Sequence, residues 1–175
     1  MVIGILDIQG SVEEHFSALK KCGVEPVLVK KPEDLRGLSG LIIPGGESMT
    51  ISKLLRWYKF GNLKNLPIFG TCAGAILLAK MGLLNAEVDR NAYGRQLDSF
   101  ETGISVPILG KKKVEAIFIR APKFKKVGKN VEVLAEYKSD PVFVRQGRIL
   151  ASTFHPELTD DMRIHEYFIK MIDGG

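Results

Sequence analysis

The segment Gly70-Thr71-Cys72-Ala73-Gly74 places a cysteine between two glycines, at a point where an apolar strand is expected to become a helix. This G-x-C-x-G pattern is the thiol version of the nucleophile elbow, a sharp strand-to-helix turn that exposes its central side chain above the end of a sheet. The turn strains the central residue, and side chains two positions away would clash, which explains the glycines. The pattern predicts a reactive Cys72; a buried structural cysteine before a helix is the alternative interpretation.

The start of the following helix would also favour chemistry at this cysteine. A thiol at a helix N-terminus with a histidine nearby ionises more readily than a free cysteine. The backbone N–H of Ala73 is expected to point to the place where an oxyanion forms. The other cysteine, Cys22, has no such context, and we expect it in the core or on a helix surface.

A histidine and a carboxylate follow an apolar strand far along the chain, in the segment STFHPE at residues 152–157. Because residues i and i+2 of an extended segment point to the same side, Glu157 is placed to accept a hydrogen bond from one ring nitrogen of His155. The other ring nitrogen would then face Cys72. These three residues have the types needed for the nucleophile, base and orienting carboxylate of a hydrolytic triad.

A glycine pair follows a further apolar strand, in the segment PGGES at residues 44–48. Pro-Gly-Gly forms tight turns without any function, which is one interpretation. In the other, Gly45 and Gly46 lack side chains, so their backbone can approach a substrate and supply a second oxyanion donor beside the elbow. On this interpretation the oxyanion donors are Gly46 and Ala73.

These three motifs, in this order, resemble those of the class I, triad-type glutamine amidotransferases. Other segments narrow the resemblance to the glutaminase subunits of pyridoxal 5′-phosphate synthase. They are IQGSVEEH (residues 8–15), DRNAYGRQLDSFE (89–101), FIRAP (118–122) and HPELTDD (155–161). The resemblance covers nearly the whole chain.

The resemblance implies roles for individual residues. Cys72 would attack the carboxamide of L-glutamine, and His155 and Glu157 would complete the triad. Arg90 and Arg120 carry guanidinium groups, which suit a carboxylate ligand. Without the resemblance, these two arginines would indicate surface salt bridges. The expected glutamine-binding residues are Gly45, Gly46, Glu47, Arg90, Ile119 and Arg120, and Gln9 and His15 are expected near the site or on a partner surface.

The activity implied by the resemblance is hydrolysis of L-glutamine to L-glutamate and ammonia, without a metal or organic cofactor. The ammonia would pass to a (β/α)₈ synthase subunit that makes pyridoxal 5′-phosphate, and docking of that subunit would switch the glutaminase on. A chain of 175 residues has no room for the synthase, so we expect it on another polypeptide. Two alternatives are a DJ-1-like cysteine redox or stress protein and a non-catalytic regulatory subunit of the same fold.

The elements that must position these residues alternate in the first half of the chain. Strands are predicted at residues 2–8, 24–30, 40–46 and 66–70, and helices from a Ser11–Glu14 capping box to Cys22, over 48–59, and from about Ala73. Further strands are predicted at 83–88, 99–109, 114–121 and 131–137, then a hairpin over 141–154 and a final helix after 159–161. This order predicts a three-layer, flavodoxin-like α/β fold. Its mostly parallel sheet has helices on both faces and an antiparallel region added in the second half.

Composition and charge exclude several classes of protein. The length suits a single domain over residues 1–175. The net charge of +5 comes from scattered lysine clusters without interleaved aromatic residues, so no nucleic-acid partner is expected. No apolar run approaches the roughly 18–20 residues that span a bilayer, so we expect no membrane association. Two cysteines and no signal-peptide pattern favour a cytoplasmic protein.

Overall fold

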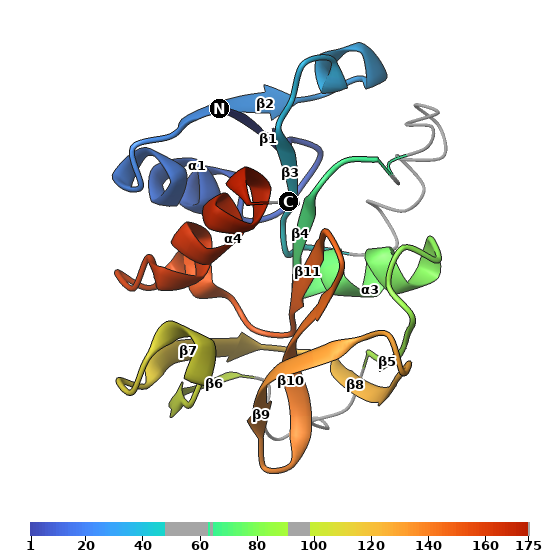
Figure 1. Ribbon diagram of the computed structural model, residues 1–175, viewed down its shortest axis with the longest axis vertical. Coiled ribbons are helices and arrows are strands. Elements are labelled where there is room, and N and C mark those ends of the chain that lie inside the picture. Colours follow the sequence, from blue (N-terminus) through green and yellow to red (C-terminus); the bar gives the residue numbers. More distant parts are fainter. Residues whose placement is uncertain (48–62, 64, 91–98, 175) are drawn as a thin grey trace.

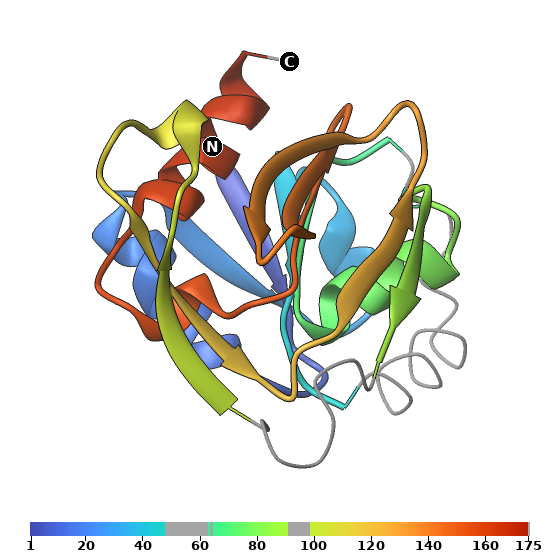
Figure 2. The same ribbon diagram turned by 90° about the horizontal axis from the view of Figure 1, so that it is seen from below.

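A seven-stranded sheet forms the centre of the computed structural model, which describes residues 1–47, 63, 65–90 and 99–174 (Figures 1 and 2). The strand order is β2-β1-β3-β4-β11-β10-β9. The first five of these strands are parallel, and β10 and β9 are antiparallel to their neighbours. The strands span β1 (Val2–Leu6), β2 (Glu25–Val29), β3 (Gly40–Ile43), β4 (Ile68–Thr71), β9 (Glu132–Tyr137), β10 (Asp140–Gln146) and β11 (Ile149–Ser152). The predicted mostly parallel sheet is therefore confirmed.

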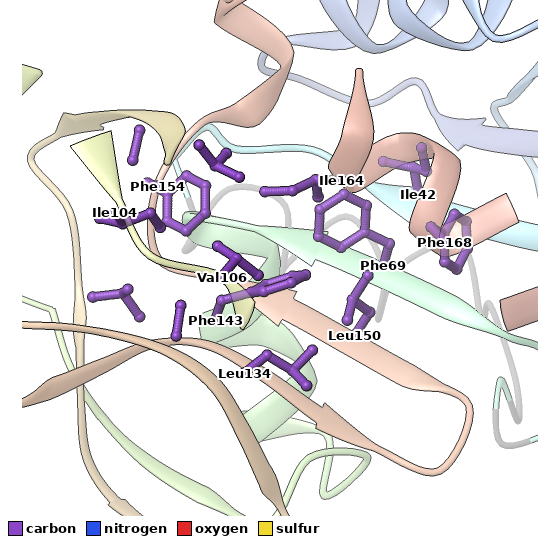
Figure 3. Packing of buried hydrophobic residues seen from close by; sticks show 14 of the residues in the cluster. Ile42, Phe69, Ile104, Val106, Leu134, Phe143, Leu150, Phe154, Ile164 and Phe168 are labelled. Carbon is purple, nitrogen blue, oxygen red and sulfur yellow. The ribbon is translucent and has the colours of Figure 1, made fainter. Parts of the chain in front are cut away.

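Helices cover both faces of this sheet. The helices α1 (Val12–Lys21) and α4 (Arg163–Asp173) lie on one face, and α3 (Ala73–Lys80) lies on the other (Figure 1). Neighbouring positions of β3 illustrate the two cores: Ile42 packs with the α1 and α4 side, whereas Ile43 packs with the α3 side. Figure 3 shows the first core, in which aromatic and branched side chains from the sheet meet those of α4. Successive side chains of each buried strand point to opposite faces of the sheet, so a core forms on each face. The fold therefore has three layers.

The second half of the chain adds two small antiparallel sheets. One pairs β5 (Ala86–Asp89) with β8 (Lys123–Val127), and the other pairs β6 (Ser99–Ile104) with β7 (Val114–Ile119). Three short 3₁₀ helices complete the described elements: η1 (Pro32–Leu35), η2 (Pro107–Leu109) and η3 (Pro156–Leu158). The strand β8 was not predicted, because its sequence KFKKV buries only Phe124 and resembles a basic surface segment.

Two expectations about helices have different outcomes. The predicted helix over residues 48–59 lies outside the described residues. The capping box at the start of α1 is wrong, because the Ser11 side chain makes no cap hydrogen bond and its hydroxyl donates instead to Glu157. A local sequence pattern was therefore overridden by a long-range contact with the functional site.

The predicted hairpin over residues 141–154 is confirmed and has a consequence for the site. Its second strand, β11, pairs with β10 on one side and runs parallel to β4 on the other. The β11–β4 register aligns Ser152 with Thr71, so both strands end at the same edge of the sheet. The chain segments that follow these two strands, which carry Cys72 and His155, therefore begin side by side.

Candidate active site

Cys72 occupies a strained turn between β4 and α3. Its backbone has φ 48° and ψ −103°, a conformation that L residues rarely adopt. A side chain on Gly70 would lie 2.7 Å from the backbone of Gly74, and one on Gly74 would overlap the carbonyl oxygen of Ile43 in β3. The two glycines therefore permit the close approach of strand and helix that the elbow pattern predicts.

His155 and Glu157 meet beside this turn. The Nδ1 atom of His155 lies 2.7 Å from Oε1 of Glu157, and the Cys72 side chain lies close enough to His155 to affect its pKa. A side chain on Gly45 would overlap the His155 ring and lie 3.3 Å from Cβ of Cys72, so the glycine loop packs against both residues. The predicted contact of His155 with Glu157 is present, but the segment between them is the 3₁₀ helix η3, not an extended strand.

The electrostatics of the site favour a charged His155 imidazolium paired with a Glu157 carboxylate. Burial disfavours the imidazolium of His155, but its interactions with Cys72 and Glu157 outweigh burial and raise the pKa of His155 to about 10. Burial likewise opposes ionisation of Glu157, but His15, His155 and Ser11 lower its pKa to about 2. Glu157 is therefore a carboxylate at neutral pH, suited to orient the His155 ring and to stabilise its charged form.

A cavity of about 430 Å³ opens above Cys72. Its lining consists of Gly46, Glu47, Cys72, Ala73, Ile76, Arg90 and Arg120. Nη2 of Arg90 lies 3.9 Å from Oε1 of Glu47, and Sγ of Cys72 lies 3.9 Å from the carbonyl oxygen of Ile119. Arg120 has a positive φ of 43°, so its backbone is strained next to the cavity. A mixed lining of one carboxylate and two guanidinium groups suits a small zwitterionic ligand.

The remaining predicted residues lie close to this cavity or behind it. Gln9 is exposed, and its backbone carbonyl oxygen would lie 3.4 Å from a Cβ atom added to Gly46. The N–H of Gly45 donates to the Thr71 hydroxyl at 3.0 Å, so its proton is not directed at the cavity. His15, expected near the site or on a partner surface, is fully buried and lies near the site, behind Glu157.

Three polar residues around the triad were not recognised from the sequence. Ser11 donates to Glu157, Thr71 accepts from the glycine loop, and His165 contacts His15. His165 lies between Ile164 and Glu166 in the predicted final helix, and Ser11 matched a helix cap, so neither carried a signal of its own. Within the described residues, no group of three His, Cys, Asp or Glu side chains is placed to hold a metal ion.

A family model identifies the chain from its sequence. The model of the SNO glutamine amidotransferase family matches residues 5–174. The chain belongs to this family. Relatives called pyridoxal 5′-phosphate synthase subunit PdxT are 52% identical in Thermotoga petrophila, over 98% of this chain and 100% of that protein, and 53% identical in Dictyoglomus turgidum, over 97% and 98%.

Solved structures agree with this membership of the SNO glutamine amidotransferase family. A crystal structure of a glutamine amidotransferase has a TM-score of 0.92 at 47% identity, and it covers 99% of this chain and 100% of that one. The structure of PurLQS from Thermotoga maritima has a TM-score of 0.74 at 16% identity, over 97% of both chains, which shows a shared fold alone. No helix among the described residues is long and apolar enough to cross a membrane.

Proposed function

We propose that this protein is the glutaminase subunit of a pyridoxal 5′-phosphate synthase, which hydrolyses L-glutamine to L-glutamate and ammonia. One observation carries the proposal. Cys72 lies in a strained turn at the wall of a cavity, beside His155 and next to the same glycine loop, and His155 is paired in turn with Glu157. Full-length relatives with about half of their residues identical bear the name of that subunit, which favours this function over a redox or regulatory role.

The first half of the reaction forms a covalent intermediate. His155 holds the proton of the Cys72 thiol as an imidazolium, the form that its surroundings favour, and the Cys72 thiolate adds to the side-chain carboxamide carbon of glutamine. The negative charge that develops on the carboxamide oxygen is stabilised by the N–H groups of Gly46 and Ala73, which both line the cavity. Loss of one such donor typically slows a reaction of this kind about 10²- to 10³-fold.

The intermediate then loses ammonia and is hydrolysed. The His155 imidazolium gives its proton to the leaving nitrogen, the carbon–nitrogen bond breaks, and a γ-glutamyl thioester remains on Cys72. His155 next takes a proton from water, whose oxygen adds to the thioester carbon. Collapse of this adduct expels the Cys72 sulfur, which regains its proton, and releases glutamate. Throughout both halves Glu157 holds one tautomer and one orientation of His155.

The charged residues of the cavity would hold the amino-acid end of glutamine. Arg90 and Arg120 are suited to the α-carboxylate, since a guanidinium can donate two parallel hydrogen bonds to it. Glu47, already near Arg90, is suited to the α-ammonium group. This arrangement extends the carboxamide towards Cys72, and Gly45 and the Ile119 backbone border that end of the site.

The ammonia released here requires a receiving partner, because free ammonia is protonated in bulk water at neutral pH. We propose that a (β/α)₈ synthase subunit docks over the cavity, receives the ammonia and activates the glutaminase. Both cysteines are free thiols, as expected in a reducing compartment, and we place the complex in the cytoplasm. The whole chain acts in this proposal as one amidotransferase domain.

Glutamate release from L-glutamine tests the proposal, with wild type and Cys72→Ala each measured alone and with the synthase subunit. We expect release that depends on the synthase and that disappears in Cys72→Ala. The matched variant Cys22→Ala alters the other free thiol and should retain the activity. A verified wild-type complex that releases no glutamate would refute the assignment.

A further inference from the structure

Two buried histidines lie directly behind the triad and take no part in the mechanism above. His15 in α1 and His165 in α4 both have 0% exposure. Nδ1 of His15 lies 3.0 Å from Nε2 of His165, and Nε2 of His15 lies 3.1 Å from the Thr71 hydroxyl oxygen and 3.5 Å from Oε2 of Glu157. The histidine pair, His15 and His165, therefore connects helix α4 to the carboxylate of the triad.

The positions of the ring protons follow from their surroundings. Nδ1 of His165 is buried without a hydrogen-bond partner in the described structure. A buried N–H without an acceptor costs more free energy than a buried lone pair without a donor. His165 therefore carries its proton on Nε2, and this N–H donates a hydrogen bond to Nδ1 of His15. His15 then carries its own proton on Nε2. That N–H donates to the Thr71 hydroxyl oxygen at 3.1 Å, and Oε2 of Glu157, which has no hydrogen-bond partner in the described structure, lies 3.5 Å from the same nitrogen.

The reverse tautomers would be unfavourable at both ends of the pair. A proton on Nδ1 of His165 would have no acceptor there. The unprotonated Nε2 of His15 would then face the Glu157 carboxylate at 3.5 Å, which places two electron-rich groups against each other. Only the first arrangement turns the positive end of an N–H dipole, and not a lone pair, towards this side of the carboxylate.

Both histidines of the pair are neutral in this setting. Burial lowers the pKa of His165 to about 3, and it also lowers the pKa of His15. The charged or titratable groups that act on His15 are Glu157, His155 and, from its own helix, Glu14, in addition to His165 itself. His15 is therefore a neutral polar group 3.5 Å from Oε2 of Glu157 and adds no full positive charge to the site.

We propose that His15, held in its tautomer by His165, is a positioning residue whose N–H dipole attracts Oε2 of Glu157 from 3.5 Å and so keeps the carboxylate aligned with His155. The same N–H reaches the Thr71 hydroxyl, which accepts the N–H of Gly45. The histidine pair thus supports the triad carboxylate and the glycine loop together. This role rests on the proposed glutaminase function, in which Glu157 orients His155.

A pair of polar substitutions tests the role of the His15 N–H. In His15→Gln the side-chain amide nitrogen can reach the position of Nε2, whereas in His15→Asn it reaches only the position of Nδ1. The control is Leu19→Ala, which leaves a cavity in the same helix at a fully buried residue outside the polar contacts described above. Two quantities are measured: the pH at which the His155 ring titrates by NMR in the free subunit, and kcat and KM for glutamine in the synthase complex.

We expect His15→Asn to lower the pH of His155 titration by about one unit and to reduce kcat roughly tenfold, with KM nearly unchanged. His15→Gln should restore most of both quantities. Leu19→Ala should reduce stability and leave the His155 titration where it is in wild type. Equal His155 titration in His15→Asn, His15→Gln and wild type would overturn the proposal and leave the pair as structural core residues.

The two readouts separate this proposal from the glutaminase assignment. The NMR titration needs no turnover, so it decides whether His15 acts on the Glu157–His155 pair even if the complex releases no glutamate. Should His15→Asn fail to fold, Thr71→Ser and Thr71→Val provide a second comparison. Thr71→Ser keeps the hydroxyl that links His15 to Gly45 and should keep kcat, while Thr71→Val should reduce it; equal kcat in both would contradict the link to the glycine loop.

Discussion

The two sides of the triad are built differently. On the open side, the cavity is lined by charged residues that are exposed or half-buried, including Glu47, Arg90 and Arg120. On the closed side, His15 and His165 are neutral, fully buried and carried by the helices α1 and α4. The groups proposed to bind glutamine lie at chain turns near solvent, whereas those proposed to position other side chains lie on regular elements in the core.

The largest effect is expected where the two sides meet, at Glu157. Glu157→Gln removes the charge that stabilises the His155 imidazolium, and its amide can present an N–H to Nδ1 and favour the wrong tautomer. We expect kcat for glutamine hydrolysis in the synthase complex to fall by about 10³- to 10⁴-fold. The matched change Glu13→Gln, at an exposed carboxylate of α1, should alter kcat less than about twofold. A fall of less than tenfold in Glu157→Gln would contradict the role of this carboxylate.

The open side should affect binding more than turnover. Arg90→Gln and Arg120→Gln each remove a charged hydrogen-bond donor from the cavity, so we expect KM for glutamine to rise about 10- to 100-fold with a smaller change in kcat. The exposed Arg148 lies at the opposite end of β11, and Arg148→Gln serves as the control with unchanged KM. Loss of kcat at constant KM in both cavity variants would assign them a role in the chemical step instead.

The closed side should affect the pH dependence of stability. His165 has a pKa of about 3 when folded and about 6.5 when unfolded, so below pH 6.5 the unfolded chain binds the extra proton. The free energy of unfolding therefore falls as the pH falls, by up to about 1.4 kcal/mol per pH unit. His165→Leu should reduce this slope in urea unfolding between pH 6.5 and 5, above the titration range of Glu157. An unchanged slope would contradict the burial of a neutral imidazole.

The sequence was most informative about features with a local pattern. The glycines around Cys72 predicted the turn, and strand alternation predicted the parallel sheet, because both follow from steric rules that act over a few residues. The pairing of β11 with β4, which brings His155 to Cys72, is a long-range event. It could be inferred only through the chemistry that the two residues would share and through the family resemblance.

Most contacts on the closed side of the site could not be predicted from the sequence. Ser11 matched a helix cap, although its hydroxyl bonds Glu157 across the fold, and His165 lies in an ordinary amphipathic helix. A buried polar group is recognised by its partner, and the partners here are 146 and 150 residues apart along the chain. No local pattern can encode such a contact.

Cys72 is proposed to carry the γ-glutamyl group, and acid quenching of the synthase complex during turnover of labelled glutamine tests this role most directly. After proteolysis, mass spectrometry locates the label, and the peptide with Cys22 serves as an internal control. We predict a γ-glutamyl adduct on the Cys72 peptide alone, absent from Cys72→Ala. Turnover with the adduct on Cys22, or on neither cysteine, would contradict the account.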